Sequence, residues 1–209
     1  MTDFAVDTEG EPAAAPDPAL GLVVGTFSIA DLDAFLADLD EIAAETGAVV
    51  QAFDADLVVS SAHLREAARL AARSIARGEA VARDPGVEIL LYAAGRRQID
   101  RALELGVSEG ERAAVVLVAD FGDVPGVDRP ATDVDGAAEA VRELTADGGD
   151  GAGELDESRN PAFDESQNPA FDEDRIREFY GVTDRELAAT TGDLADVVRE
   201  RVALLDVEK

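Results

Sequence analysis

The sequence has no cysteine and no tryptophan, and it has a single histidine and a single lysine, Lys209. Without cysteine the chain cannot form disulfides, thiolate metal sites or a cysteine nucleophile, so nothing suggests secretion. Without an internal lysine it cannot build a Walker A phosphate loop. No run approaches the roughly 18 apolar residues of a membrane span. The first residues also lack the basic and apolar regions of a signal peptide. We therefore expect a cytoplasmic protein without a membrane partner.

Other signatures of catalysis are missing as well. The sequence contains no Rossmann glycine fingerprint, no zinc-ligand spacing and no nucleophile elbow. Carboxylate pairs occur in every segment, so none of them is diagnostic. The sequence alone therefore shows no sign of an enzyme, and we expect no catalytic residue, no metal and no cofactor.

Positive charge is scarce overall. Asp and Glu number 46 against 18 Lys and Arg, and the formal net charge is −28. One cause would be a specific cationic partner, and the other a high-salt cytoplasm in which salt screens the self-repulsion of the acids. The acids are spread along the whole chain, which favours the second cause. The composition therefore indicates a halophilic protein, and its 46% hydrophobic residues indicate a folded one.

Residues 60–106 form a basic island in this acidic chain. They hold eight arginines and six acids, so their formal charge is 8 − 6 = +2. Four arginines recur at i, i+4 spacing in the expected helix 62–77 and would form a continuous ridge on one face. Guanidinium groups bind phosphates bidentately, although a solvated helix face is the ordinary use of such residues. The ridge and a following Arg-Arg pair are our candidate RNA-binding residues: Arg65, Arg69, Arg73, Arg77, Arg96 and Arg97.

Hydrophobic periodicity and turn signals predict the remaining elements. A single α/β (α+β) domain is expected, in which several helices pack on a small mixed or antiparallel sheet. The segment 113–119 is expected to be the central strand, covered on both faces. Residues 87–94 could form a buried strand or a short helix and fit a helix slightly better. The expected strands are 20–27, 48–53, 57–60 and 113–119, and the expected helices are 31–46, 62–77, 96–105, 137–144, 174–179, a short one opened by Thr183, and 194–205.

Composition also sets the domain boundaries. Residues 1–19 are acidic and proline-rich, so we expect them to be disordered. The folded domain should comprise residues 20–144 and 174–209. Between its two parts, residues 145–173 read as an acidic, flexible insertion that contains the tandem octapeptide DESRNPAF/DESQNPAF. The alternative is a short linear motif anchored by Phe163 and Phe171.

Two further features allow alternative interpretations. The last helix carries an apolar stripe that either closes the core or docks a partner. Its candidate partner-binding residues are Val198, Val202 and Leu205. The histidine, His63, either is a buried polar residue near a helix start or contacts a ligand. A stand-alone domain or enzyme that binds a small anionic molecule through His63 and Arg96 is therefore the alternative function.

Several segments together resemble a known family. They are His63-Leu64 before an alanine-rich helix, the segment EILLY at 88–92, RRQI at 96–99, FYGVT at 179–183 and VVRERVAL at 197–204. This combination resembles the small accessory subunit of the KEOPS/EKC complex, the PRPK-binding protein (TPRKB-like) family. The resemblance covers roughly residues 20–144 and 174–205. The acidic N-terminus and the octapeptide insertion depart from the family pattern.

The resemblance implies a single α/β domain without catalytic activity. Together with the acidic composition, it leads us to expect a subunit of a tRNA-modifying complex in a salt-adapted, archaeon-like cytoplasm. Family members bind the small atypical kinase/ATPase subunit of KEOPS and help the complex make N6-threonylcarbamoyladenosine in tRNA. They also help to recruit tRNA by its single-stranded 3′ CCA end. The resemblance implies that the C-terminal helix contacts the kinase. The assignment of individual arginines to tRNA rests on their charge and spacing alone. No DNA partner is expected.

Overall fold

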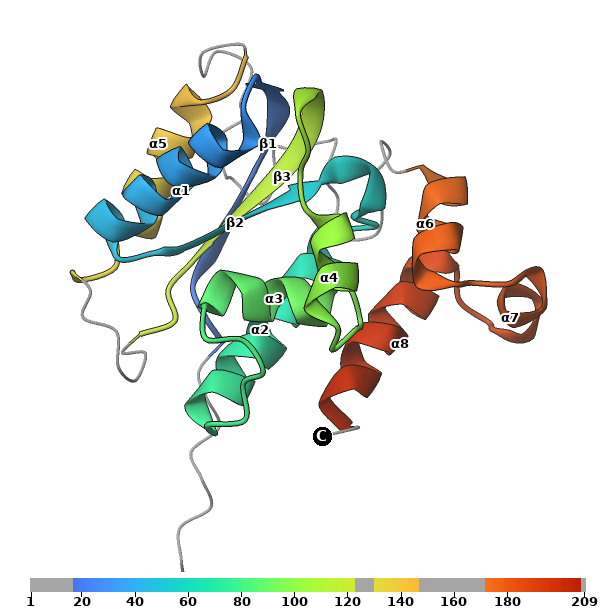
Figure 1. The fold of residues 1–209 in the computed structure, drawn as a ribbon. Helices are drawn as coiled ribbons and strands as arrows, with labels where there is room; N and C mark the ends of the chain where they lie inside the picture. The colour runs from blue at the N-terminus through green and yellow to red at the C-terminus, as the bar shows by residue number, and fades with distance from the viewer. Residues whose placement is uncertain (1–16, 123–129, 147–171, 208–209) are drawn as a thin grey trace, which may run out of the picture.

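The computed structural model describes residues 17–122, 130–146 and 172–207. The octapeptide repeat and nearly all of the predicted disordered N-terminus and acidic insertion lie outside these residues. The described part forms one α+β domain with eight α-helices and a three-stranded sheet (Figure 1). The expected fold class is confirmed.

The sheet consists of β1 (Leu20–Ile29), β2 (Val49–Asp54) and β3 (Gly110–Ala119) in the order β1-β3-β2. Both neighbouring pairs are antiparallel, which decides between the mixed and antiparallel alternatives. β1 and β2 therefore run parallel to each other on either side of β3, and α1 (Leu32–Thr46) connects them. The prediction that the segment 113–119 is the central strand is confirmed.

β3 supplies both hydrophobic cores of the domain. Val115, Leu117 and Ala119 belong to one core, and the alternating residues Ala114, Val116 and Val118 belong to the other. This alternation is the period of two that places successive side chains on opposite faces of a sheet. α1 and α5 (Val134–Glu143) cover one face. The other face is covered by α2 (Ser61–Ala76), α3 (Pro85–Ala93) and α8 (Leu194–Val207).

Helix ends follow the cap signals in the sequence. α1 ends at Gly47, whose φ of 66° lies in the left-handed region that glycine tolerates. Ser60, one of two predicted caps for α2, accepts a hydrogen bond from the His63 backbone N–H at 3.1 Å. α8 begins with reciprocal bonds between Asp193 and Asp196, in which each side chain accepts from the other residue's backbone N–H.

Two predicted elements are corrected. Residues 57–60 are not a strand, because the chain forms the 3₁₀ helix η1 (Ala55–Leu57) and then leads into the cap of α2. The apolar run there is buried but does not join the sheet, so burial rather than strand formation explains its composition. The predicted helix 96–105 is instead α4 (Ile99–Ala102) followed by η2 (Leu103–Leu105). Gly95 has a left-handed φ of 59°, so residues 96–98 form a connection rather than a helical turn.

The ambiguous segment 87–94 lies in helix α3. Asp84 caps this helix at 2.9 Å from the Val87 nitrogen, and Pro85 occupies its first turn, where no N–H is needed. Two further helices precede α8. These are α6 (Glu173–Tyr180) and α7 (Asp184–Ala189), with Thr183 capping α7 through the Glu186 N–H at 3.2 Å.

Candidate functional site

Two of the four arginines in the ridge on α2, Arg69 and Arg73, form ion pairs within the chain. Arg69 donates from Nε and from an Nη atom to the two carboxylate oxygens of Glu66, at 2.9 and 2.6 Å. This bidentate bond raises the pKa of Arg69. Arg65 is half-buried and Arg77 is exposed. The predicted face exists, but Arg69 already has an anionic partner one turn away.

Arg73 contacts a different helix, whereas the partner of Arg69 lies on α2 itself. It forms an ion pair with Asp206 of α8, whose other oxygen accepts a hydrogen bond from the Tyr92 hydroxyl of α3 at 3.3 Å. The Asp206 side chain is only 14% exposed and that of Arg73 29%. This cluster joins three helices, so the charge of Arg73 serves the packing of α2, α3 and α8.

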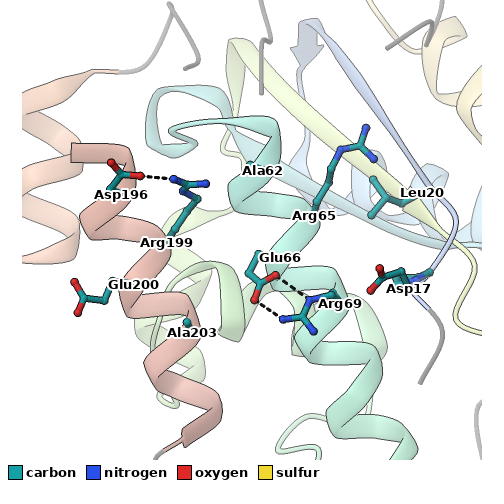
Figure 2. Close-up of a pocket in the computed structure, with 11 residues that line it drawn as sticks. Asp17, Leu20, Ala62, Arg65, Glu66, Arg69, Asp196, Arg199, Glu200 and Ala203 are labelled. Carbon is teal, nitrogen blue, oxygen red and sulfur yellow. Dashed lines mark hydrogen bonds and ion pairs between the residues drawn. The ribbon is translucent and has the colours of Figure 1, made fainter. Parts of the chain in front are cut away.

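A groove of about 640 Å³ runs along the surface between α2 and α8 (Figure 2), and we call it the α2–α8 groove. Its charged lining consists of three arginines and four acids, a formal balance of 3 − 4 = −1. Arg199 on α8 is paired with Asp196, just as Arg69 on α2 is paired with Glu66. The charged side chains of the lining are Arg65, Arg69, Arg199, Asp17, Glu66, Asp196 and Glu200. A polyanion entering this groove would meet about as many acids as bases.

The second arginine group has a different environment. Arg96 donates a hydrogen bond to the backbone oxygen of Phe179 in α6, and its guanidinium carbon lies 5.3 Å from the centroid of the Phe179 ring. Both contacts are with uncharged groups of Phe179, so neither of them offsets the positive charge of Arg96. The neighbouring Arg97 is exposed. We call the surface around Arg96, Arg97 and Phe179 the Arg96 corner.

Two hollows flank the Arg96 corner, with volumes of about 250 and 290 Å³. The smaller one is lined by Arg96 and Arg201 among its described residues and by no acid. The larger one contains three arginines and two acids, a balance of 3 − 2 = +1. Its charged side chains are Arg96, Arg101, Arg175, Glu104 and Glu178. Several of these arginines also form ion pairs with acids, as Arg201 does with Glu186 at 2.8 Å. The corner nevertheless presents more positive charge than the α2–α8 groove.

His63 lies in the first turn of α2 and is completely buried. Its Nε2 lies 2.8 Å from the carbonyl oxygen of Ala93, which can only accept, so Nε2 carries the proton. The Tyr180 hydroxyl donates to the same oxygen at 3.0 Å. Burial lowers the pKa of His63 to about 4 and raises that of Tyr180. His63 therefore links α2, α3 and α6 as a neutral side chain, and no ligand can reach it in this structure.

The predicted partner-binding stripe lies inside the domain. Val198 and Val202 are 0% exposed and Leu205 is 6% exposed, all within the core that α8 shares with α2 and α3. Val198 and Val202 close the core, whereas Leu205 also lines the smaller hollow at the Arg96 corner. The solvent side of α8 carries Leu204, which is 48% exposed. The partner-docking role of α8 stays a prediction, and only this outer side is available for it.

The residues that converge on Arg96 were missed by sequence reasoning. Phe179 lies 83 positions away along the chain, and Arg175 and Arg201 come from α6 and α8. Arginines in those helices are interspersed with acids, so local spacing gives no signal of a basic surface. The hints were the FYGVT and VVRERVAL segments, which contain Phe179 and Arg201 and entered only through the family resemblance.

Within the described ranges, no set of three or more His, Cys, Asp and Glu side chains is placed to hold a metal ion. Nor does any described helix combine the length and apolar character that crossing a bilayer requires.

Comparison with known proteins gives one family. The family model described as kinase binding protein CGI-121 matches residues 34–206, well over half of the 209 residues. The match includes the ridge, the Arg96 corner and nearly all of α8. No curated protein matches the chain.

Proposed function

The chain belongs to the CGI-121 family of kinase-binding proteins, and on this premise we propose that it is a non-catalytic subunit of a KEOPS complex. In this role it binds and regulates the small atypical kinase/ATPase and helps to dock tRNA for N6-threonylcarbamoyladenosine formation. Membership confirms the resemblance on which the sequence interpretation rested. The family match is the single observation that carries the proposal.

The kinase would contact the outer side of α8. Leu204 offers a large exposed apolar side chain there, beside the exposed Ala203. Apolar side chains that are half exposed on a charged helix suit a partner surface, because burying them in a complex is favourable. The buried Val198 and Val202 would support this surface from beneath by holding α8 in place.

The tRNA would contact the Arg96 corner rather than the whole ridge. Single-stranded nucleic acid is typically bound by guanidinium groups on phosphates together with aromatic rings or guanidinium planes against bases. Arg96 and Phe179 form such a combination, and Arg97 adds an exposed cation beside them. In a salt-rich cytoplasm, which the acidic composition favours, diffuse phosphate attraction is weak. A local site with both ring and charge fits that condition better than an extended ridge.

Two binding assays at high KCl test the proposal. The first measures binding of the purified kinase subunit to the wild-type chain and to Leu204→Glu, with Val81→Glu as the matched control. Val81 is also 48% exposed but precedes α3 and is not part of α8. We expect Leu204→Glu to weaken kinase binding by about tenfold or more, which corresponds to about 1.4 kcal/mol. No binding of the wild-type chain to the kinase would refute the kinase half of the proposal.

The second assay measures binding of tRNA with and without its CCA end. We expect removal of CCA to weaken binding to the wild-type chain and to have little effect on Arg97→Glu, which has already lost the local contact. Equal binding of both tRNAs to the wild-type chain would refute the tRNA half. The kinase assay on Arg97→Glu is the control, because this exposed residue should leave kinase binding unchanged.

A further inference from the structure

The smaller hollow at the Arg96 corner is built by three separate elements. It measures about 250 Å³. Residues 94–96 follow α3, Tyr180 ends α6, and Arg201, Leu204 and Leu205 belong to α8. Pockets for drug-sized ligands measure about 300–1,000 Å³, so a hollow of this size suits a small molecule or one residue of a longer chain.

Gly95 brings the two arginines of this hollow close together. Its φ of 59° lies in the left-handed region, which lets the chain turn after α3. A Cβ atom added at Gly95 would lie 3.2 Å from the Cβ of Arg201, so this turn packs directly against α8. Arg96 is the next residue, and its side chain therefore leaves the backbone beside Arg201.

Among the described residues, each of these two arginines commits a single guanidinium nitrogen. Arg96 donates from Nη2 to a backbone oxygen of α6. Arg201 donates from Nη2 alone to both carboxylate oxygens of Glu186, at 2.8 and 3.0 Å, and its Nε is buried, so Nη1 is the donor that it can offer. Arg69 of the ridge differs, since it commits both Nε and Nη2 to one carboxylate. The hollow therefore retains donors for an anion.

The charge of the lining also favours an anion. No acid lies among the described residues that line the hollow, whereas four acids line the α2–α8 groove. The whole chain carries a net charge of −28, so a concave surface with arginines and without acids is unusual for this protein. An anion that enters it meets two guanidinium groups and no carboxylate in the wall.

Apolar groups complete the wall and favour an organic anion. Leu204 is 48% exposed and lies in the same lining as the arginines. The Tyr180 hydroxyl already donates its hydrogen to the Ala93 backbone oxygen at 3.0 Å, so this residue contributes mainly its ring. An inorganic ion would leave Leu204 in water, whereas the organic part of an ester would cover it, which is favourable.

We propose that the smaller hollow binds the phosphate group and ribose of a single nucleotide. The tetrahedral phosphate accepts hydrogen bonds from Arg96 and Arg201, because its oxygens point in different directions, and the ribose packs against Leu204. A planar carboxylate suits one guanidinium group rather than two. The nucleotide is either the last residue of an RNA, a source that rests on the proposed function, or a free mononucleotide, which does not.

Calorimetric titration at high KCl, without kinase or tRNA, tests this proposal with AMP and adenosine as the probes. We expect AMP to bind at least about tenfold more tightly than adenosine, because only AMP carries the phosphate. Equal affinities of the two probes, or no binding of AMP, would overturn the proposal.

Three variants locate the site. We expect Arg201→Gln to weaken AMP binding by about tenfold or more. The matched control is Arg199→Gln, which removes the same charge from α8 at a residue of the α2–α8 groove and should lose less than about twofold. Glu186→Gln breaks the ion pair of Arg201 but keeps its guanidinium, so AMP binding should persist. Equal losses in Arg201→Gln and in either of the other variants would overturn the proposal.

The RNA trinucleotide CCA identifies the source of the phosphate. Tighter binding of CCA than of AMP assigns the hollow to the end of an RNA, and weaker binding assigns it to a free mononucleotide. Arg97 does not line the hollow, so Arg97→Glu should keep AMP binding within about threefold of wild type while it loses the effect of the CCA end on tRNA binding. If AMP binds as expected but both tRNAs bind the wild-type chain equally, the proposed tRNA role fails and the nucleotide site stands.

Discussion

The arginine ridge of α2 and the Arg96 corner differ in what surrounds each positive charge. On α2, Glu66 holds Arg69 and Asp206 holds Arg73, and the second pair joins three helices. At the corner, Arg96 contacts a carbonyl oxygen and an aromatic ring. The regular spacing of the ridge therefore shows only that its arginines share one face of the helix. Whether their charge is available to a ligand depends on the acids that folding brings close to them.

The comparison predicts first that a ridge arginine is needed for stability and a corner arginine is not. We expect Arg73→Glu to lower the free energy of unfolding by about 2–3 kcal/mol, because it places a carboxylate against the largely buried Asp206. This cost lies below that of breaking a fully buried ion pair, since Arg73 is partly exposed. Arg97→Glu should change stability by less than about 0.5 kcal/mol. Urea denaturation of both variants measures the difference. Equal stabilities of the two variants would contradict the prediction that only the ridge arginine is needed for stability.

The buried base of α2 predicts a specific pH dependence. His63 titrates near 6.5 when unfolded and at about 4 when folded, so its contribution is complete above pH 6.5 and falls as pH drops toward 4. Between pH 7 and pH 5 this amounts to about 2 kcal/mol of lost stability. His63→Gln cannot titrate, so it should lack this part of the pH dependence. The measurement is the difference in unfolding free energy between wild type and His63→Gln across that range, because carboxylate titration then cancels. A constant difference would contradict the assignment.

Sequence reasoning predicted those parts of the molecule that depend on local pattern. The central strand, α2 with its serine cap, and the left-handed end of α1 follow from periodicity and cap residues. The stripe of α8 was also found, but periodicity does not say whether an apolar face meets its own core or a partner. Val198 and Val202 proved to be core.

The features that sequence reasoning got wrong or missed depend on contacts between residues that are far apart in the sequence. The segment 57–60 is apolar because the core covers it, and a buried segment outside the sheet can have the same composition as a short strand. Asp206 lies 133 positions from Arg73, so the ion pair between them has no local signal. The same holds for Phe179 beside Arg96. The RNA-binding role of Arg73 stays a prediction.

The ridge and the Arg96 corner should also differ in their contribution to RNA binding. We expect Arg97→Glu to weaken binding of tRNA by about tenfold, which corresponds to about 1.4 kcal/mol. Arg69→Glu should weaken it by less than about threefold, because the bond to Glu66 already neutralises that guanidinium. Both variants change the net charge equally, so a general electrostatic effect would give equal losses. Filter binding at two KCl concentrations distinguishes these outcomes, and a larger loss in Arg69→Glu would return the RNA site to the ridge.

The smallest expected effect tests directly whether pairing with Glu66 causes the difference in RNA binding between the ridge and the Arg96 corner. If pairing keeps the ridge from binding phosphate, then Glu66→Gln should release Arg69 and strengthen tRNA binding by about twofold to threefold. Glu66 is 31% exposed in the pair, so the substitution should leave the fold intact. Glu41→Gln removes the same charge from the exposed surface of α1, across the sheet, and corrects for the change in net charge. If Glu66→Gln gains no more affinity than Glu41→Gln, pairing with Glu66 does not control the ridge, and the position of the arginines relative to the RNA must do so instead.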